Sequence, residues 1–280
     1  MTTRSALLHD IVRRALKEDL ASGDITTRLL FPNAVKAKAV IQAKQEGIVA
    51  GLPVVKMVFE QVDPKLRCKP IVRDGARVKL GTIVAHLHGD GRSILKGERV
   101  ALNFLQHLSG IATLTAQFVE AVKGTKTKIL DTRKTTPGLR VLEKYAVRMG
   151  GGQNHRMNLS DGLLIKDNHI ALAGSLKKAV HLAKKNMPRG FKVEVEATNL
   201  REVEHAVASK ADIILLDNMT VSQLKEAVMR TENRALTEAS GGINLKNVRE
   251  IASTGVDFIS IGALTHSAPA LDFSLELLHG

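Results

Sequence analysis

The chain has 280 residues, of which 44% are hydrophobic, so it can bury one large core or two modest ones. A membrane-spanning helix is excluded, because no run of roughly eighteen apolar residues occurs. A single cysteine, Cys68, excludes an internal disulfide framework and a cysteine-based zinc cluster. The N-terminal pattern is amphipathic and lacks the features of a signal peptide, so we expect a protein of the reducing cytoplasm.

The formal net charge of +13 indicates either anionic partners or a basic, solvated surface. Nucleic acid is one such partner, because a basic surface attracts phosphate backbones. However, the chain has one tyrosine, no tryptophan and no dense block of lysine and arginine. We therefore expect no nucleic-acid partner. A small, highly anionic substrate in a cationic pocket is the alternative source of the charge.

The first third of the sequence predicts a mixed unit of helices and strands. A helix is expected over residues 5–20, and Gly23 ends it. Strand patterns with intervening glycine and aspartate turns follow, and one amphipathic helix lies among them. The predicted strands cover residues 35–43, 47–50, 66–72 and 82–87, and the helix covers residues 52–62.

One long helix is predicted over residues 97–122. Val100, Phe104, Leu108 and Ile111 recur at helical spacing and form an apolar stripe. Because the pattern changes after Gly124, this helix is expected to link two domains.

Strands and helices alternate after Gly124, which favours parallel strands joined by right-handed crossovers. We prefer an α/β barrel with fewer than the usual eight strands, and an open doubly wound sheet is the alternative. No Gly-x-Gly-x-x-Gly motif follows the first strand, which disfavours a dinucleotide-binding fold. The six predicted strands are residues 128–132, 163–166, 192–196, 212–217, 235–239 and 258–262, and the helices are 176–185, 200–208, 221–229 and 245–252.

Polar or glycine residues stand at the end of every predicted strand of this second half. In parallel α/β barrels, catalytic residues gather where strands end and the following loops begin. These chain segments are therefore expected to meet in one mouth. In chain order they are Asp131-Thr132-Arg133-Lys134, Lys166, Glu196, Asp217, Ser240-Gly241-Gly242 and Gly262-Ala263.

Two kinds of group divide this mouth by charge. Ser240-Gly241-Gly242 precedes a helix that is expected to begin near Asn244. The backbone N–H groups of this glycine segment and the dipole of the helix are suited to bind a phosphate, and Gly262 is expected beside them. Glu196 and Asp217 are acceptor-only groups, suited to ribose hydroxyls, to a magnesium ion, or to both. The alternative is that these two carboxylates pair with neighbouring lysine or arginine.

Longer motifs occur in a fixed order along the chain. The central one reads LDTRKTTPGLR over residues 130–140, and the others are EDLASGDIT (18–26), GER (97–99), KYAVR (144–148), GGG (150–152), NHR (154–156), SD (160–161), LIKDNH (164–169), LLDN (215–218), SGG (240–242) and GALTHS (262–267). This ordered set resembles the quinolinate phosphoribosyltransferase family, from about Glu18 to Ser267.

The resemblance implies a subunit of α/β class with two domains. An α/β sandwich would comprise residues 1–109, and the C-terminal tail, residues 268–280, would return to it. An irregular, incomplete α/β barrel of six strands would comprise residues 110–267. The resemblance also implies a homodimer, or a higher oligomer built from it, in which each active site is completed by the other subunit.

The activity that the resemblance implies is transfer of a phosphoribosyl group from phosphoribosyl pyrophosphate (PRPP) to quinolinate. Carbon dioxide and pyrophosphate would be released and nicotinate mononucleotide formed, a step in the biosynthesis of NAD. Magnesium would be the required ion. A related phosphoribosyltransferase that acts on another aromatic acid is the alternative.

The resemblance also assigns residues to the two substrates. Quinolinate would be surrounded by Arg99 of the partner subunit and by Thr132, Arg133, Lys134, His155, Arg156 and Lys166. Glu196 and Asp217 would face the ribose and the metal, and the phosphate would lie on Ser240, Gly241, Gly242 and Gly262. Lys134, His155, Lys166, Glu196 and Asp217 are the expected catalytic residues. Lys134 or His155 would donate the proton that replaces the lost carboxylate.

Overall fold

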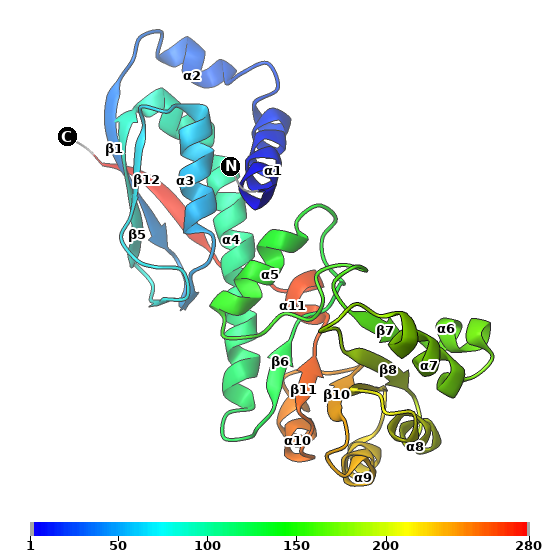
Figure 1. The fold of residues 1–280 in the computed structure, drawn as a ribbon. Helices are drawn as coiled ribbons and strands as arrows, with labels where there is room; N and C mark the ends of the chain where they lie inside the picture. The colour runs from blue at the N-terminus through cyan, green and yellow to red at the C-terminus, as the bar shows by residue number, and fades with distance from the viewer. Residues whose placement is uncertain (1–2, 279–280) are drawn as a thin grey trace. The chain divides into compact units, whose positions relative to one another are not determined.

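The structure is a computed structural model, describes residues 3–278 and belongs to the α/β class (Figure 1). The chain divides into two compact units. The first comprises residues up to Leu114, Thr136–Gly151 and the chain from Ser267, and the second comprises Thr115–Thr135 and Gly152–His266. None of the described helices combines the length and the apolar character needed to cross a bilayer.

The first unit contains a four-stranded antiparallel sheet in the order β12-β1-β5-β3, which matches the expected sandwich of a sheet and helices. Its strands are β1 (Lys36–Ala43), β3 (Arg67–Pro70), β5 (Ile83–Asp90) and β12 (Phe273–Leu278), with a small pair β2 (Gly47–Ile48) and β4 (Arg77–Val78). Its helices are α1 (Thr3–Leu20), α2 (Ile25–Leu30), α3 (Leu52–Val62), the first part of α4 (Gly91–Ala121) and α5 (Arg140–Met149). Helices α3 and α4 pack closely, since a Cβ added at Gly97 would lie 2.8 Å from the Phe59 ring.

The C-terminal tail forms the edge strand of this sheet. Strand β12 runs antiparallel to β1, with Leu275 opposite Ile41 and Phe273 opposite Ala43. Residues 279 and 280 of the predicted tail, like residues 1 and 2 of the predicted first domain, lie outside the described residues.

The second unit contains six parallel strands in the order β6-β11-β10-β9-β8-β7. They are β6 (Lys128–Leu130), β7 (Leu163–Ile165), β8 (Val193–Ala197), β9 (Ile213–Asp217), β10 (Leu236–Ser240) and β11 (Phe258–Ser260). The helices between them are α6 (Asp167–Ala173), α7 (Leu176–Asn186), α8 (Leu200–Ala208), α9 (Val221–Thr231) and α10 (Val248–Ser253), and α11 (Ala263–His266) follows β11. The first strand pairs with the last, as in a barrel, and no ladder joins β6 to β7 among the described strands.

The open side of β6 is covered by an irregular segment. Gln153 forms an isolated parallel bridge with Leu130, and its backbone N–H donates to the carbonyl of Ile129 over 2.8 Å. The incomplete six-stranded barrel predicted from the family resemblance is therefore the observed architecture, with its seam between the first and second strands.

The unit boundaries differ from the expected boundary at 109/110. That position lies inside α4, which is one continuous helix. Helix α5, expected in the barrel domain, belongs to the first unit because its side chains bond there. Glu143 lies 2.8 Å from Nε2 of His107, and the hydroxyl of Tyr145 donates to Asp74 over 2.7 Å.

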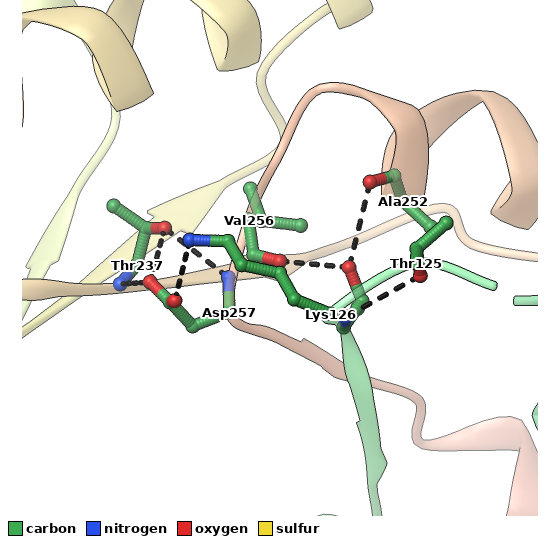
Figure 2. A network of polar contacts seen from close by, with 7 residues as sticks. Thr125, Lys126, Thr237, Ala252, Val256 and Asp257 are labelled. Carbon is green, nitrogen blue, oxygen red and sulfur yellow. Dashed lines mark hydrogen bonds and ion pairs between the residues drawn. The ribbon is translucent and has the colours of Figure 1, made fainter.

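A polar network fixes the barrel at the amino-terminal ends of its strands (Figure 2). Asp257 accepts hydrogen bonds from the backbone N–H and hydroxyl of Thr237, over 2.9 and 3.0 Å, and pairs with Lys126 at 2.7 Å. Thr127 donates from its hydroxyl to the carbonyl of Val256 over 2.7 Å. In barrels this end of the sheet contributes to stability, while the opposite end carries the chemistry.

Candidate active site

A cavity of about 450 Å³ lies at the carboxyl ends of the barrel strands. It gathers every site residue predicted in the second half of the chain. Those residues are Thr132, Arg133, Lys134, His155, Arg156, Lys166, Glu196, Asp217, Ser240, Gly241, Gly242 and Gly262. Their arrangement follows from the fold, because parallel strands bring their following loops to one edge of the sheet.

Arg99 is the predicted site residue that does not line this cavity. It lies on α4 in the first unit, and its side chain is exposed. Its neighbour Glu98 is partly buried, and this burial raises the pKa of that carboxyl group, an effect that the positive charge of Arg99 partly offsets.

Asp131 anchors the loop that carries two of the predicted quinolinate ligands. Its fully buried carboxylate follows β6 directly. One oxygen accepts a hydrogen bond from the backbone N–H of His155 over 2.9 Å, and the other accepts from the side-chain amide of Asn154. These two bonds to one carboxylate position Asn154 and His155 at the end of β6.

Both ring nitrogens of His155 are occupied by protein groups. The backbone N–H of Arg156 donates to Nδ1 over 2.8 Å, so Nδ1 is the unprotonated nitrogen and Nε2 carries the hydrogen. Nε2 lies 3.1 Å from Glu194 and 3.7 Å from Glu238. The histidine ring therefore faces the barrel interior with its N–H group. This geometry weighs against the expectation that His155 hands a proton to the substrate.

Arg156 stands beside a second guanidinium in a partly enclosed position. Burial and then the positive charge of Arg133 lower the pKa of Arg156, and the carboxylate of Glu194 partly offsets them. One guanidinium N–H donates to the carbonyl of Gly162 over 3.2 Å, which orients the group. Two like charges held close together favour a bound anion, because it relieves their repulsion.

Lys166 and Glu196 form an ion pair across the ends of β7 and β8, with 2.7 Å between Nζ and Oε2. On the next strand, Asp217 accepts a hydrogen bond from the side-chain amide of Asn218 over 2.8 Å. Lysine pairing, the alternative weighed for these carboxylates, thus applies to Glu196. The two acids still form an oxygen-donor set on adjacent strands, which suits a magnesium ion with few protein ligands.

The glycine loop after β10 is held by Asn218 and by its own asparagines. The backbone N–H of Asn218 donates to the carbonyl of Ser240 over 2.9 Å, and the side chain of Asn247 donates to the carbonyl of Gly242 over 3.1 Å. The expected helix is present as α10, but its predicted start near Asn244 is wrong, because a turn occupies residues 244–247 and α10 begins only at Val248. Backbone N–H groups of the loop, without an adjoining helix terminus, remain suited to a phosphate.

Next to the glycine loop, the segment after β6 contacts α11, which follows β11. The hydroxyl of Thr265 donates to the carbonyl of Lys134 over 2.7 Å. A Cβ added at Gly262 would lie 2.9 Å from the Lys134 side chain, so the absence of a side chain at Gly262 admits the lysine. His266 also lines the cavity.

Two buried glutamates of the barrel interior were absent from the predicted set. Glu194 on β8 and Glu238 on β10 are 5% and 1% exposed, and Glu238 lines the cavity. The sequence does indicate these two residues, because each is a glutamate within a predicted strand. Side chains alternate between the two faces of a strand, so every second one points into the barrel.

Comparison with known proteins identifies the family. Residues 24–109 match the family model for the N-terminal domain of quinolinate phosphoribosyl transferase, and residues 111–276 match the model for its C-terminal domain. A probable nicotinate-nucleotide pyrophosphorylase [carboxylating] of Synechocystis is 46% identical, over 94% of this chain and 90% of that protein. The nicotinate-nucleotide pyrophosphorylase [carboxylating] of Mycobacterium leprae is 44% identical over 96% of both chains.

Solved structures agree with these sequence matches over almost the whole chain. The nicotinate-nucleotide pyrophosphorylase of Francisella tularensis superposes with a TM-score of 0.94 at 43% identity, covering 98% of this chain and 96% of that one. NadC from Streptococcus pyogenes superposes with a TM-score of 0.92 at 45% identity, covering 96% of each chain. The chain therefore belongs to the quinolinate phosphoribosyl transferase family.

Proposed function

We propose that the protein transfers the phosphoribosyl group of PRPP to the ring nitrogen of quinolinate, with release of pyrophosphate and carbon dioxide, and so forms nicotinate mononucleotide. The observation that carries this proposal is the division of one cavity by charge. Cationic side chains follow β6 and β7, whereas carboxylates and a glycine loop follow β8 to β10. One half suits a flat diacid, and the other suits a phosphorylated ribose.

Arg133 and Arg156 bind the two carboxylates of quinolinate. A guanidinium offers a planar fork that matches a carboxylate with two parallel hydrogen bonds, and lysine cannot reproduce this geometry. Each charge-assisted contact contributes on the order of 1.5–3 kcal/mol. Because the positive charge of Arg133 lowers the pKa of Arg156, a dianionic ring fits the site better than a monoacid.

Orientation is the main catalytic contribution of these residues. The ring nitrogen must approach the anomeric carbon from the side opposite the departing pyrophosphate, and such positioning can remove roughly 7–11 kcal/mol of a barrier at best. Glu196 and Asp217 stabilise the positive charge that develops on the ribose. They would also hold a magnesium ion, which when bound supplies positive charge for the pyrophosphate.

We further propose a homodimer in which Arg99 of each subunit completes the site of the other. The exposed side chain of Arg99 on α4, which is not among the residues that line the cavity, supports this part of the proposal. A cytoplasmic location is proposed as well. The lone Cys68 supports it, since a chain with one cysteine has no internal disulfide that would need an oxidising compartment.

One assay tests the reaction. Purified protein with quinolinate, PRPP and magnesium is expected to form nicotinate mononucleotide and release carbon dioxide, whereas nicotinate in place of quinolinate should react far more slowly. Equal turnover of the monoacid would favour a phosphoribosyltransferase of another aromatic acid. Omission of magnesium tests the ion separately.

Subunit mixing tests the shared site. Subunits with Arg99→Ala are mixed with subunits with Lys166→Ala, and verified heterodimers are isolated. One of the two sites then has both native residues, so about half of the wild-type activity should return. Inactive heterodimers would show that Arg99 acts within its own chain.

A further inference from the structure

The interior of the barrel holds a cluster of one histidine and two carboxyl groups, two of whose members, His155 and Glu238, also line the cavity. Donor atoms of His155, Glu194 and Glu238 all lie within 4.8 Å of one another. A metal ion is not the best occupant, because Nδ1 of His155 accepts a backbone N–H and Nε2 therefore carries a hydrogen. A nitrogen that carries hydrogen has no lone pair to offer a metal.

Glu238 differs from Glu194 in its hydrogen bonding. Glu194 faces the N–H of His155 at 3.1 Å. The Ser260 hydroxyl near Glu238 favours the ionised form of that side chain, but among the described residues Oε1 of Glu238 has no hydrogen-bond partner, although the side chain is almost completely buried. An ionised carboxylate without a donor costs far more free energy to bury than a neutral carboxyl group does.

The charges around Glu238 favour its neutral form. Burial is the largest effect and the Glu194 carboxylate the next, and together they raise the pKa of Glu238 to about 7, against a smaller opposing effect of His155. Asp131, from the end of β6, acts in the same direction as Glu194. A dianionic quinolinate in the cavity adds further negative charge and raises this pKa again.

We propose that Glu238 is the general acid that protonates the pyridine ring after decarboxylation. This inference rests on the proposed function. Glu238 is among the residues that line the cavity, and its Oε1 has no hydrogen-bond partner among the described residues, so the protein does not hold this carboxyl group in its ionised form through that oxygen. Of the two donors expected earlier, His155 has both nitrogens engaged within the protein.

The step balances without a further reactant. The bond between ring carbon C2 and its carboxylate carbon breaks, carbon dioxide leaves, and the electron pair stays on C2, stabilised by the adjacent quaternary nitrogen. The O–H bond of Glu238 then breaks as a C2–H bond forms. Glu238 is left as a carboxylate beside the N–H of His155, and solvent reprotonates it before the next turnover.

Glu238→Gln separates transfer from protonation. Glutamine keeps the size of the side chain but is no acid, so single-turnover release of pyrophosphate should stay within about threefold of wild type. Formation of nicotinate mononucleotide should slow by at least about 100-fold, the usual size of a general-acid contribution. The matched control is Glu250→Gln on the exposed face of α10, with wild-type kinetics expected.

A second variant keeps the inference testable if Glu238→Gln does not fold. In the wild type, kcat should fall as pH rises through the pKa of Glu238, because the acid is then lost. Glu194→Gln removes the neighbouring negative charge that raises this pKa, so the fall in kcat should move to lower pH.

Three results would overturn the assignment. They are unchanged product formation in Glu238→Gln, equal slowing of pyrophosphate release and product formation, and a pH profile that Glu194→Gln leaves in place. Equal slowing would mark Glu238 as a structural residue of the barrel. A wild-type protein that makes no nicotinate mononucleotide would instead refute the proposed function, so the two failures are distinguishable.

Discussion

The ammonium group of Lys166 lies 2.7 Å from Oε2 of Glu196, across the ends of two neighbouring barrel strands. The lysine side chain is 47% exposed and the glutamate side chain 15%. Lys166, which is predicted to bind quinolinate, is thus paired with Glu196, which is predicted to face the ribose and magnesium. We predict that substrate binding separates this pair, since quinolinate would offer Lys166, and magnesium would offer Glu196, a stronger opposite charge.

Lys166→Met should therefore weaken quinolinate binding without destabilising the fold. We expect the quinolinate KM to rise about tenfold or more, because a charge-assisted contact is lost. The free energy of unfolding should change by less than about 1 kcal/mol, the usual limit for an exposed ion pair. Lys123→Met, which breaks an exposed pair with Glu120, is the control for both measurements. A fall in thermal stability without a change in KM would contradict the substrate role.

Arg156→Lys keeps the positive charge but removes the planar fork. Its effect should fall mainly on quinolinate, with a loss of about 10-fold to 100-fold in affinity, while PRPP affinity changes little. Isothermal titration with each substrate measures the two affinities. An equal loss for both substrates would argue against a carboxylate contact.

The glycine loop offers a matched pair of substitutions. Gly241 and Gly242 both have positive φ, +95° and +63°, but a Cβ at Gly241 would lie 2.1 Å from Oδ1 of Asn218, whereas nothing lies within 4 Å at Gly242. Gly242→Ala should therefore cost only about 1–2 kcal/mol of backbone strain. Gly241→Ala should in addition displace the loop and raise the PRPP KM markedly more. Identical PRPP kinetics in the two variants would show that the close packing of Gly241 against Asn218 does not position the loop for PRPP.

Asp257→Ala should destabilise the barrel and leave the kinetics unchanged. Loss of its bonds to Thr237 and Lys126 should cost about 1–3 kcal/mol. Burial raises the pKa of Asp257, but the hydrogen bonds from Lys126 and Thr237 outweigh it, so the net pKa is lowered. The stabilisation is then present above the ordinary value of 3.8 and is lost as pH falls through the lowered pKa. Chemical denaturation of both proteins at several pH values checks this, with a constant difference at all pH as the contrary outcome.

Glu238 gives the opposite pH dependence. Its pKa in the folded protein, about 7, lies above the ordinary value of 4.5, so its favourable contribution is complete below pH 4.5 and is lost as pH rises through 7. Each unit of such a shift corresponds to about 1.4 kcal/mol. Relative to the wild type, Glu238→Gln should therefore become more stable between pH 5 and pH 8 (roughly the window of the shift). A flat difference across this window would indicate an ionised Glu238 throughout.

The strands of the barrel and its catalytic rim could be predicted from the sequence, because both depend on local patterns. Apolar runs such as Ile213-Ile214-Leu215-Leu216 indicate strands buried on both faces, and Glu196 and Asp217 lie at the ends of β8 and β9 as expected. The roles of these residues stay predictions.

Other features depended on contacts between distant segments. Helix α4 begins at Gly91, six residues before the predicted start at Gly97, and α5 was not predicted. Helix α5 is held by polar contacts of Glu143 with His107 on α4 and of Tyr145 with Asp74. Sequence periodicity does not reveal such contacts between distant residues. Glu238 was missed for a similar reason, because its surroundings come from β6, β8 and β11.

The open seam between β6 and β7 leaves strand edges through which two chains could pair. An exposed strand edge is a template for pairing with another chain and thus for aggregation. Gln153 occupies that edge of β6, and β7 is only three residues long. The barrel can therefore remain open without offering a long, unprotected edge, and the segment that guards it is continuous with Asn154, His155 and Arg156.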